Sequence, residues 1–278
     1  MRKPIEKIVS QALSEDIGEE DLTTNTTVAR ELRCRARLIS KDQGILSGMK
    51  PFRCAFELMD ADIQDWQGLD DGASFGHGDL LAEFSGNAQA VLSAERTALN
   101  FVQRLSGVAT LTAQFVGSVN GLKCRICGTR KTSPMLRQLE KQAIVHGGGS
   151  NHRHTLFNGI LIKENHIKMA GGITEAIRRA VEGTHHLMRI GIEVTNLEEF
   201  DEALAASADV IMLDNMSIEK MCEAVERARG QRVVLEASGN ATLERVRAMA
   251  ETGVQFVSVG MLTHSARSID MTLLIDHI

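Results

Sequence analysis

Aromatic residues are scarce in this chain of 278 residues: they make up 4% of it, and tyrosine is absent. Proteins that bind single-stranded nucleic acid without sequence preference stack the bases on aromatic side chains. The composition therefore argues against that class. The formal net charge is -5 at pH 7, and no long basic stripe suggests a polyanionic partner. We expect no nucleic-acid partner.

Long hydrophobic runs are also missing. No apolar stretch approaches the roughly 20 residues that a membrane-spanning helix requires, and the N-terminal segment MRKPIEKIVSQALSEDIGEED turns acidic where a secretory signal would stay apolar. With 43% hydrophobic residues, the chain can still build one large or two ordinary globular domains. We expect a cytoplasmic protein with no membrane partner.

Cysteine is sparse and irregularly spaced. The five cysteines are scattered along the chain, and their odd number argues against a disulfide framework. Cys124 and Cys127 lie close together in a segment expected to form a strand, where a spacing of three directs two side chains to opposite faces. Buried structural cysteines are therefore favoured over a metal pair or a redox motif.

Positive charge is concentrated between residues 130 and 168. This segment carries Arg130, Lys131, Arg137, Lys141, Arg153, Lys163 and Lys168, with His146, His152, His154 and His166 among them. Two glutamates, Glu140 and Glu164, oppose these cations. An excess of cations in a concave site concentrates anions, so we interpret the segment as a site for small, multiply anionic metabolites.

Two local features of this segment bear on anion binding. Ser133 and Pro134 have the residue types of a helix N-cap and first helical position, which predicts a positive helix end beside the first two cations. The GGGS run at 147–150 predicts a flexible loop that lets the residues after it reach the site. No Gly-Lys-Ser/Thr follows that run, which argues against a nucleotide-triphosphate P-loop.

The first part of the chain predicts an α+β domain with short strands. Residues 34–40 alternate between apolar and polar types, residues 51–60 have a helical pattern, and residues 79–84 form a second candidate strand. Near residue 107 the residue pattern of the chain changes.

A long helix is expected from Ala88. Arg96 shares its apolar face with Leu92 and Leu99, because these positions are spaced by four and three. Such an arginine needs a partner. It could form an ion pair within a helix or between domains, or it could bind an anion in a site built by another domain or subunit.

After residue 121, candidate strands and helices alternate. The expected strands are residues 122–127, 159–163, 187–194, 209–213, 232–236 and 255–259. Repeated βα units favour a parallel sheet buried on both faces. No dinucleotide-binding glycine fingerprint follows the first of these strands, which favours a barrel over an open doubly wound sheet.

Residues suited to chemistry follow these strands. Four ionisable residues lie at or near the ends of successive strands: Lys163, Glu193, Asp214 and Glu236. Parallel barrels place their active sites at this face, so a shared ligand site explains the four better than a structural role. The last two strands are followed by Ser238, Gly239, Gly260 and His264. Two such loops favour a phosphate site over ordinary turns.

The runs SAERTALNFVQRLSGVAT, GTRKTSP, GGGSNHR, LIKENH, IEV, VIMLDN, EASGN and SVGMLTHS, in this order, resemble the quinolinate phosphoribosyltransferase family. They span residues 93–265, and ALSEDIGEEDLTT near the N-terminus also resembles the family. The resemblance implies an α/β-sandwich domain of residues 1–107 with 266–278, and an incomplete TIM-like α/β barrel of residues 108–265. It further implies head-to-tail homodimers with shared active sites, and leaves open whether these form hexamers.

The resemblance also implies an activity. Family members transfer phosphoribosyl from phosphoribosyl pyrophosphate to quinolinate with decarboxylation, which gives nicotinate mononucleotide, pyrophosphate and carbon dioxide in de novo NAD biosynthesis. Magnesium is the implied cofactor. Such an enzyme is a nicotinate-nucleotide diphosphorylase (carboxylating), a pentosyltransferase.

Matching positions imply roles for single residues. The quinolinate-binding residues would be Arg130, His152, Arg153 and Lys163, with Arg96 from the neighbouring subunit. The residues that bind phosphoribosyl pyrophosphate would be Lys131, Glu193, Asp214, Ser238, Gly239, Gly260 and His264. The catalytic residues would be Lys131, Lys163, Glu193 and Asp214, of which Glu193 and Asp214 would also hold magnesium.

Four positions depart from residues common in the family: Met135 and Asn240 replace glycine, and Gly191 and Thr195 replace acids. They leave loop conformation and metal affinity open. Two alternatives also remain open. One is a paralogue associated with molybdate transport, and the other is a noncatalytic sensor of an anionic metabolite. Without the resemblance, the residues support a phosphate-ligand barrel enzyme, with Lys163 as a candidate Schiff-base lysine.

Overall fold

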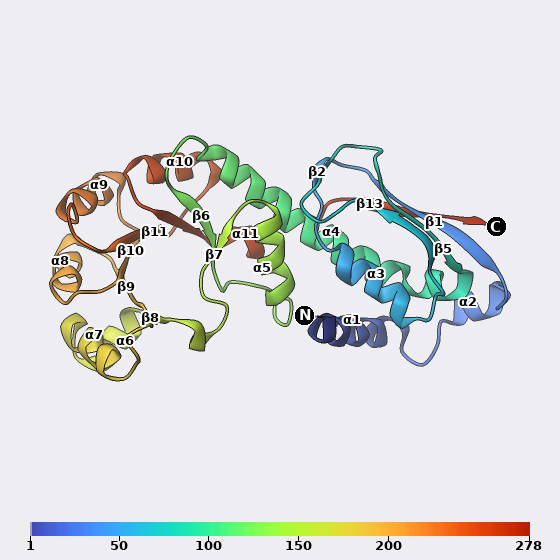
Figure 1. The fold of residues 1–278 in the computed structure, drawn as a ribbon, viewed down its shortest axis with the longest axis horizontal. Coiled ribbons are helices and arrows are strands. Elements are labelled where there is room, and N and C mark those ends of the chain that lie inside the picture. The colour runs from blue at the N-terminus through green and yellow to red at the C-terminus, as the bar shows by residue number, and fades with distance from the viewer. Residues whose placement is uncertain (1) are drawn as a thin grey trace. The chain divides into compact units, whose positions relative to one another are not determined.

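The structure is a computed structural model that describes residues 2–278 (Figure 1). Its contacts divide the chain into two compact units. The first unit contains the residues up to Ala113, together with Ser133–Gly148 and Ser265–Ile278. The second unit contains Gln114–Thr132 and Gly149–His264. The sequence assigned all of 108–265 to one domain, whereas the contacts group 108–113 and 133–148 with the first unit.

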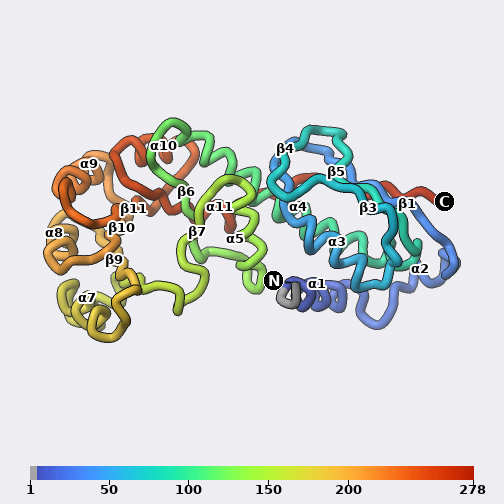
Figure 2. Tube along the Cα trace, viewed as in Figure 1, coloured from blue at the N-terminus to red at the C-terminus, as the bar shows by residue number. Residues whose placement is uncertain are grey.

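The first unit combines helices with a mostly antiparallel arrangement of strands. Its elements are α1 (Arg2–Ile17), α2 (Leu22–Thr27), β1 (Arg33–Ser40), β2 (Gly44–Ile45), α3 (Met49–Leu58), β3 (Gln64–Gly68), β4 (Ser74–Phe75), β5 (Leu80–Asn87), α5 (Arg137–His146), β13 (Met271–His277) and most of α4 (Ala88–Ser118). The main sheet has the order β13-β1-β5-β3, and β2 pairs with β4. Figure 2 shows the red C-terminal strand beside the blue β1.

The scarce aromatic residues build the core of this unit. Phe52 and Phe56 of α3 pack edge to face at 5.1 Å, and Phe56 lies 4.8 Å from Phe84 of β5. Trp66 of β3 stacks on Phe84 at 5.3 Å. Complete burial of each phenylalanine is worth roughly 1.5–3 kcal/mol, so this cluster is a main reason why α3 packs on the sheet.

The second unit is an incomplete α/β barrel. Its elements are β6 (Arg125–Gly128), β7 (Ser150–Asn151), η1 (Leu156–Asn158), β8 (Ile160–Ile162), α6 (Glu164–Ala170), α7 (Ile173–Glu182), β9 (Ile190–Val194), α8 (Leu197–Ala205), β10 (Val210–Asp214), α9 (Ile218–Arg227), β11 (Val234–Ser238), α10 (Leu243–Glu251), β12 (Phe256–Val259) and α11 (Met261–His264). The seven strands are parallel in the order β7-β6-β12-β11-β10-β9-β8. The sheet therefore curls with β7 and β8 as its two edges, and the expected fold class is confirmed.

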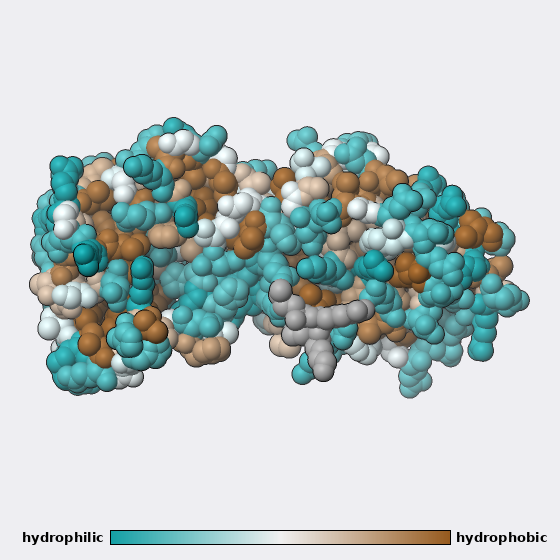
Figure 3. Space-filling model, in the orientation of Figure 1, coloured by the Kyte–Doolittle hydropathy of each residue, from teal (hydrophilic) through white to brown (hydrophobic). Residues whose placement is uncertain are grey.

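The edge at β8 carries exposed apolar side chains. Leu156 and Phe157 of η1, Met169 of α6 and Leu187 are all more than two-thirds exposed. Figure 3 shows apolar atoms among hydrophilic ones in the region of α6 and α7, at the lower left. Among the described residues, no helix is both long enough and apolar enough to cross a membrane.

One local prediction was wrong. Helix α5 begins at Arg137 with Leu136 as its N-cap, so Ser133 and Pro134 precede the helix instead of starting it. The Ser133 side chain donates to Glu140 of α5 at 3.0 Å. The loop predicted at 147–150 is present over 147–149, and Ser150 already belongs to β7, which pairs with β6.

Candidate active site

The candidate active site lies at the carboxyl ends of the parallel strands of the second unit. These ends carry Arg130 and Lys131 after β6, His152 and Arg153 after β7, Lys163 after β8, Glu193 in β9, Asp214 at the end of β10, Ser238 and Gly239 at the end of β11, and Gly260 and His264 after β12. Parallel strands direct their carboxyl ends to one face of a barrel. Eleven predicted site residues thus belong to one unit.

Lys163 and Glu193 form an ion pair at this face. The Lys163 Nζ donates to Glu193 Oε1 at 2.7 Å and to Oε2 at 2.8 Å. The two residues are brought together because β8 and β9 pair Ile162 with Ile192, directly before them. The Lys163 side chain is 46% exposed, so the pair contributes little to stability and leaves the lysine open to a ligand.

Glu236 is buried, although the sequence predicted that it opens onto the site. Met212 pairs laterally with Glu193 on one side and with Glu236 on the other, so the three side chains share one face of the sheet. Glu236 is 4% exposed and accepts a hydrogen bond from the Ser258 hydroxyl. Burial raises the pKa of Glu236 to about 6, and the Glu193 charge adds to the shift, while Ser258 and Lys163 oppose it.

Asp214 is held by a short chain of amide side chains. Its Oδ2 accepts from Asn215 Nδ2 at 2.8 Å, and Asn215 Oδ1 accepts from Asn240 Nδ2 at 3.2 Å. Gly239 has φ 85, and a Cβ there would collide with the Asn215 side chain. Glycine at 239 is therefore required for Asn215 to reach Asp214. Asn215 was not predicted as a site residue, although it follows Asp214 in the run VIMLDN.

Lys131 lies against the loop after β12. A Cβ on Gly260 would be 2.8 Å from Lys131 Cδ and 3.3 Å from His264 Nε2. The buried Thr263 hydroxyl donates to the Lys131 carbonyl oxygen at 2.7 Å. Gly260 therefore makes room for a lysine and a histidine side by side. Thr263 was not predicted, because its role is to hold the backbone of another loop.

Arg130 and Arg153 are two half-buried cations that lie near each other. Their Nε atoms are buried and have no hydrogen-bond partner among the described residues. Burial lowers the pKa of Arg153, and the charge of Arg130 lowers it further. Arg153 Nη1 donates to the Gly159 carbonyl at 2.8 Å, and the His152 backbone N–H donates to Gly128. The two guanidinium groups thus lie near each other and keep N–H donors that can bind an anion.

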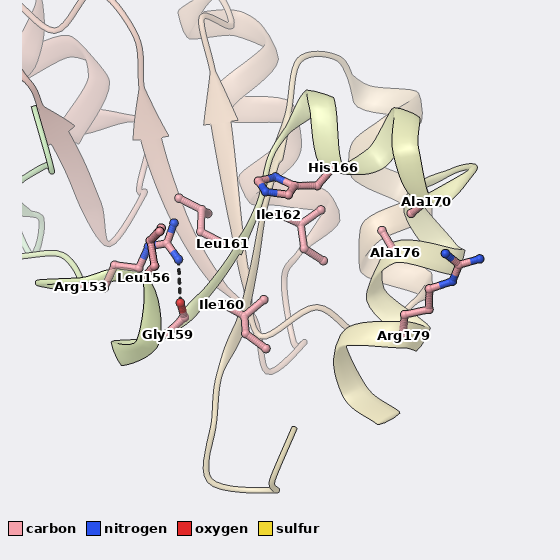
Figure 4. Close-up of a pocket in the computed structure, with 10 residues that line it drawn as sticks. All are labelled: Arg153, Leu156, Gly159, Ile160, Leu161, Ile162, His166, Ala170, Ala176 and Arg179. Carbon is pink, nitrogen blue, oxygen red and sulfur yellow. Dashed lines mark hydrogen bonds between the residues drawn. The ribbon is translucent and has the colours of Figure 1, made fainter. Parts of the chain in front are cut away.

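A pocket of about 360 Å³ lies beside Arg153 (Figure 4). Its wall includes Ile160 and Ile162 of β8, Ala170 of α6 and Ala176 of α7, and Arg153 lies at one side of it in Figure 4. The lining is mainly apolar, so the pocket adjoins the charged site at Arg153 but is unsuited to hold several anionic groups itself.

Arg96 lies on α4 in the first unit. It is exposed, and it forms no salt bridge with any residue that the structure describes, although its charge opposes the rise in the pKa of the adjacent Glu95 that burial causes. The ion pair that the sequence left open for this arginine is therefore not formed within the described chain.

The two closely spaced cysteines are buried. Cys124 and Cys127 are buried free thiols, and burial raises the pKa of Cys124 to about 11. Within residues 2–278, no group of three or more His, Cys, Asp or Glu side chains forms a metal cluster. The preference for buried structural cysteines fits the burial of both thiols.

Known proteins resemble the whole chain. A family model described as quinolinate phosphoribosyl transferase, N-terminal domain, matches residues 21–106, and the C-terminal domain model of the same family matches residues 108–274. Over 269 residues the chain is 40% identical to a probable nicotinate-nucleotide pyrophosphorylase [carboxylating] of Bacillus subtilis. The matched region covers 97% of this chain and 92% of that protein.

Solved structures give the same result. The nicotinate-nucleotide pyrophosphorylase from Francisella tularensis is 38% identical, with a TM-score of 0.92 over 99% of this chain and 97% of that one. NadC from Streptococcus pyogenes is 36% identical, with a TM-score of 0.95 over 100% and 98% of the two chains. Two family models and relatives of this identity over nearly the full length agree with the motifs. The chain therefore belongs to the quinolinate phosphoribosyl transferase family.

Proposed function

We propose that this protein transfers the phosphoribosyl group of phosphoribosyl pyrophosphate to quinolinate and releases pyrophosphate and carbon dioxide, with nicotinate mononucleotide as product. This is the reaction of a carboxylating nicotinate-nucleotide pyrophosphorylase, the activity named for its relatives. In the cell it would serve de novo NAD biosynthesis, in the cytoplasm.

The observation that carries the proposal is the pair Arg130 and Arg153. Both side chains have a buried Nε without a partner among the described residues. A buried, unpaired polar group is costly, and planar guanidinium groups pair bidentately with carboxylates. A dicarboxylate such as quinolinate supplies the missing acceptors for both arginines. His152 and Lys163 would complete the binding of its carboxylates.

The loops after β11 and β12 would bind the phosphates of the second substrate. Ser238 and Gly239 would offer a hydroxyl and a backbone N–H to the 5′-phosphate, and Gly260 and His264 would complete its site. The contact of Gly260 with both Lys131 and His264 supports this assignment. Lys131 would lie between the two substrates and neutralise charge on both.

Glu193 and Asp214 would hold the ribose hydroxyls and magnesium. Magnesium in phosphate enzymes is bound through one or two carboxylates together with substrate phosphates and water, and carboxylates near the ends of two adjacent strands fit this requirement. When bound, magnesium would neutralise negative charge on pyrophosphate. The two carboxylates would also stabilise the ribosyl centre as it becomes cationic.

The bond changes follow from this arrangement. The pyridine nitrogen would donate its electron pair to C1 of the ribose while the bond from C1 to pyrophosphate breaks. The ring nitrogen then carries a positive charge. Loss of the adjacent carboxylate as carbon dioxide leaves an electron pair on the neighbouring carbon, which takes up a proton. Lys131 and Lys163 would stabilise this carbanion-like state through their positive charge.

Arg96 supports a shared site in a homodimer. It is exposed and has no ion-pair partner within the described part of the chain. In a head-to-tail dimer, Arg96 of one subunit would add a further cation to the quinolinate site of its partner. Such dimers could assemble further into hexamers.

The direct test is an assay of the purified protein with quinolinate, phosphoribosyl pyrophosphate and magnesium. We expect nicotinate mononucleotide and carbon dioxide in equal amounts. Nicotinate in place of quinolinate is the matched control, and it should give no product because it lacks one of the two carboxylates that Arg130 and Arg153 would bind. A folded protein that binds quinolinate without turnover would instead support a noncatalytic sensor or a transport-associated relative.

A further inference from the structure

The first unit contains a buried ion pair between two helices. Arg104 of α4 donates from Nη2 to Glu140 Oε1 at 2.8 Å and from Nε to the same oxygen at 3.2 Å. The Glu140 side chain is fully buried, and the Arg104 side chain is 23% exposed. Neither residue is among those to which the proposed function assigns a substrate.

The remaining hydrogen bonds of this pair go to two particular segments. Glu140 accepts from the Ser133 backbone N–H at 2.9 Å and from the Ser133 hydroxyl at 3.0 Å. Arg104 Nη1 donates to the Ala266 carbonyl at 2.7 Å. The chain crosses from the second unit to the first at Thr132–Ser133 and again at His264–Ser265. The pair thus holds the first residues of the chain after each crossing.

Each held segment directly continues a candidate substrate loop. Ser133 lies two residues after Lys131, and Ala266 lies two residues after His264. The two loops also contact one another within the second unit, where the Thr263 hydroxyl donates to the Lys131 carbonyl. The two crossings are therefore held together in both units, by Thr263 in one and by the ion pair in the other.

Stability alone does not account for such a pair. A buried ion pair is on average no more stabilising than a well-packed apolar pair of similar volume, but it fixes its partners in direction through its hydrogen bonds. The close fit of α4 supports a positioning role, because a Cβ on Gly107 would collide with the Arg267 carbonyl. The segment after His264 is thus held against α4 at two successive positions.

We propose that Arg104 and Glu140 are positioning residues that set the substrate loops carrying Lys131 and His264. Arg104 fixes the loop after β12 through Ala266, and Glu140 fixes the loop after β6 through Ser133. The inference rests on the proposed function for the identity of the ligands. It adds that affinity for the phosphorylated substrate depends on two side chains that touch neither substrate.

The test uses Arg104→Lys. A lysine keeps the charge opposite Glu140, but its single nitrogen does not reproduce the guanidinium fork that reaches both Glu140 and Ala266. We expect its dissociation constant for phosphoribosyl pyrophosphate, measured by calorimetry with magnesium, to rise about 10-fold, as for other positioning partners. Its dissociation constant for quinolinate should stay unchanged, because the Ser133 contact remains.

Ser133→Ala gives the complementary result. It removes the hydroxyl bond to Glu140 and leaves the Ala266 contact. The loop after β6, which carries Arg130 and Lys131, is then held less firmly. Binding of quinolinate and binding of phosphoribosyl pyrophosphate should therefore both weaken. Leu38→Ala is the control, because Leu38 is fully buried in β1 and makes none of these hydrogen bonds. It should lower the melting temperature and leave both dissociation constants unchanged below that temperature.

The inference is overturned if Arg104→Lys binds phosphoribosyl pyrophosphate as tightly as the natural protein, or if Leu38→Ala weakens binding to the same degree. Because binding is measured apart from turnover, the two proposals separate. If the natural protein binds phosphoribosyl pyrophosphate without forming product, the proposed reaction is contradicted. The dissociation constants of the variants then still decide whether Arg104 and Glu140 have a positioning role. A natural protein that binds neither substrate would overturn both.

Discussion

At the scale of single residues, Glu236 differs from the exposed acids in its proton affinity. Its pKa is raised to about 6, mainly because burial penalises the charged carboxylate, from a reference value of 4.5. The neighbouring Glu193 adds to the effect, whereas Ser258 and Lys163 oppose it. Between these two pH values the folded protein binds a proton that the unfolded chain releases.

The pH dependence of stability follows from this difference. An acid whose folded pKa is raised stabilises the folded state below its unfolded pKa, and the stabilisation is lost as the pH rises through the folded value. From pH 4.5 to above 6 the loss for Glu236 is about 2 kcal/mol. Glu236→Gln removes this contribution, so its free energy of unfolding relative to the natural protein should rise by that amount. Urea titrations at pH values from 4.5 to above 6 measure this difference in the free energy of unfolding.

The control for this experiment is Glu31→Gln. Glu31 is exposed, so its substitution should leave the pH dependence of the natural protein unchanged. A constant difference between Glu236→Gln and the natural protein at all pH values would show that the pKa of Glu236 is the same in the folded and unfolded states, and would contradict the assignment.

Two departures from the family find a local explanation at the same scale. Met135 has φ 65 and Asn240 has φ 49, both in the left-handed region. Glycine adopts this region at little cost, and asparagine tolerates it better than methionine does. The common family glycines at these positions thus reflect backbone conformation. Thr195, a third departure, bonds to Glu199 at the start of α8.

At the scale of elements, α4 offers a matched pair of glycines. A Cβ on Gly107 would collide with the backbone carbonyl of Arg267, which cannot move as a side chain can, whereas Gly117 has open space around it. Gly107→Ala should lower the free energy of unfolding by roughly 1–3 kcal/mol through overpacking. Gly117→Ala should raise it by roughly 0.4–1 kcal/mol, because alanine loses less conformational entropy in a helix. Thermal unfolding of both variants compares them.

The two substitutions are chemically identical and lie in one helix, so each serves as the control for the other. Equal effects of the same sign would mean that helix propensity outweighs packing, and would contradict the close approach of α4 and the segment at Arg267.

The periodicity of apolar residues predicted those helices and strands whose formation depends on their own local sequence. The alternation of apolar strands and amphipathic helices after residue 121 predicted six strands of the barrel, with ends within about three residues of those observed. Strands β2, β3, β4, β7 and β13 were not predicted. Met271–His277 becomes a strand because β1, far away in the sequence, pairs with it. Ser150–Asn151 is too short for a periodic signal.

The site was predictable to the same extent. Residue type and position at strand ends were enough to single out Lys163, Glu193 and Asp214, and the structure brings Lys163 and Glu193 into contact. The burial of Glu236 could not be read from the sequence, because it depends on the neighbouring strands that cover it. Asn215 and Thr263 were missed because they act on other residues and carry no charge.

At the scale of the whole molecule, a shared site makes a quantitative prediction. Arg96→Met and Lys163→Met, each inactive alone, remove cations that would come from different subunits. Mixed in equal amounts and allowed to exchange, half of the dimers would be hybrids, and each hybrid would hold one site with both cations intact. We expect about a quarter of the natural activity in the quinolinate assay.

Each variant incubated alone is the control and should stay inactive. Hybrid dimers are counted by native mass spectrometry with one variant isotope-labelled. If hybrids form and activity does not return, then Arg96 does not serve the site of a second subunit.

The pairing of β13 with β1 has a consequence during translation. β1 emerges from the ribosome long before Met271–His277, and the whole second unit is synthesised between them. Nascent domains usually fold from the N-terminus as they appear. The sheet β13-β1-β5-β3, however, is complete only after β13, the last strand of the chain, has been synthesised. Until then one edge of β1 has no partner, and unpaired strand edges attract other chains. The unpaired edge of β1 is therefore a site at which the nascent chain is prone to aggregate until Met271–His277 has been synthesised.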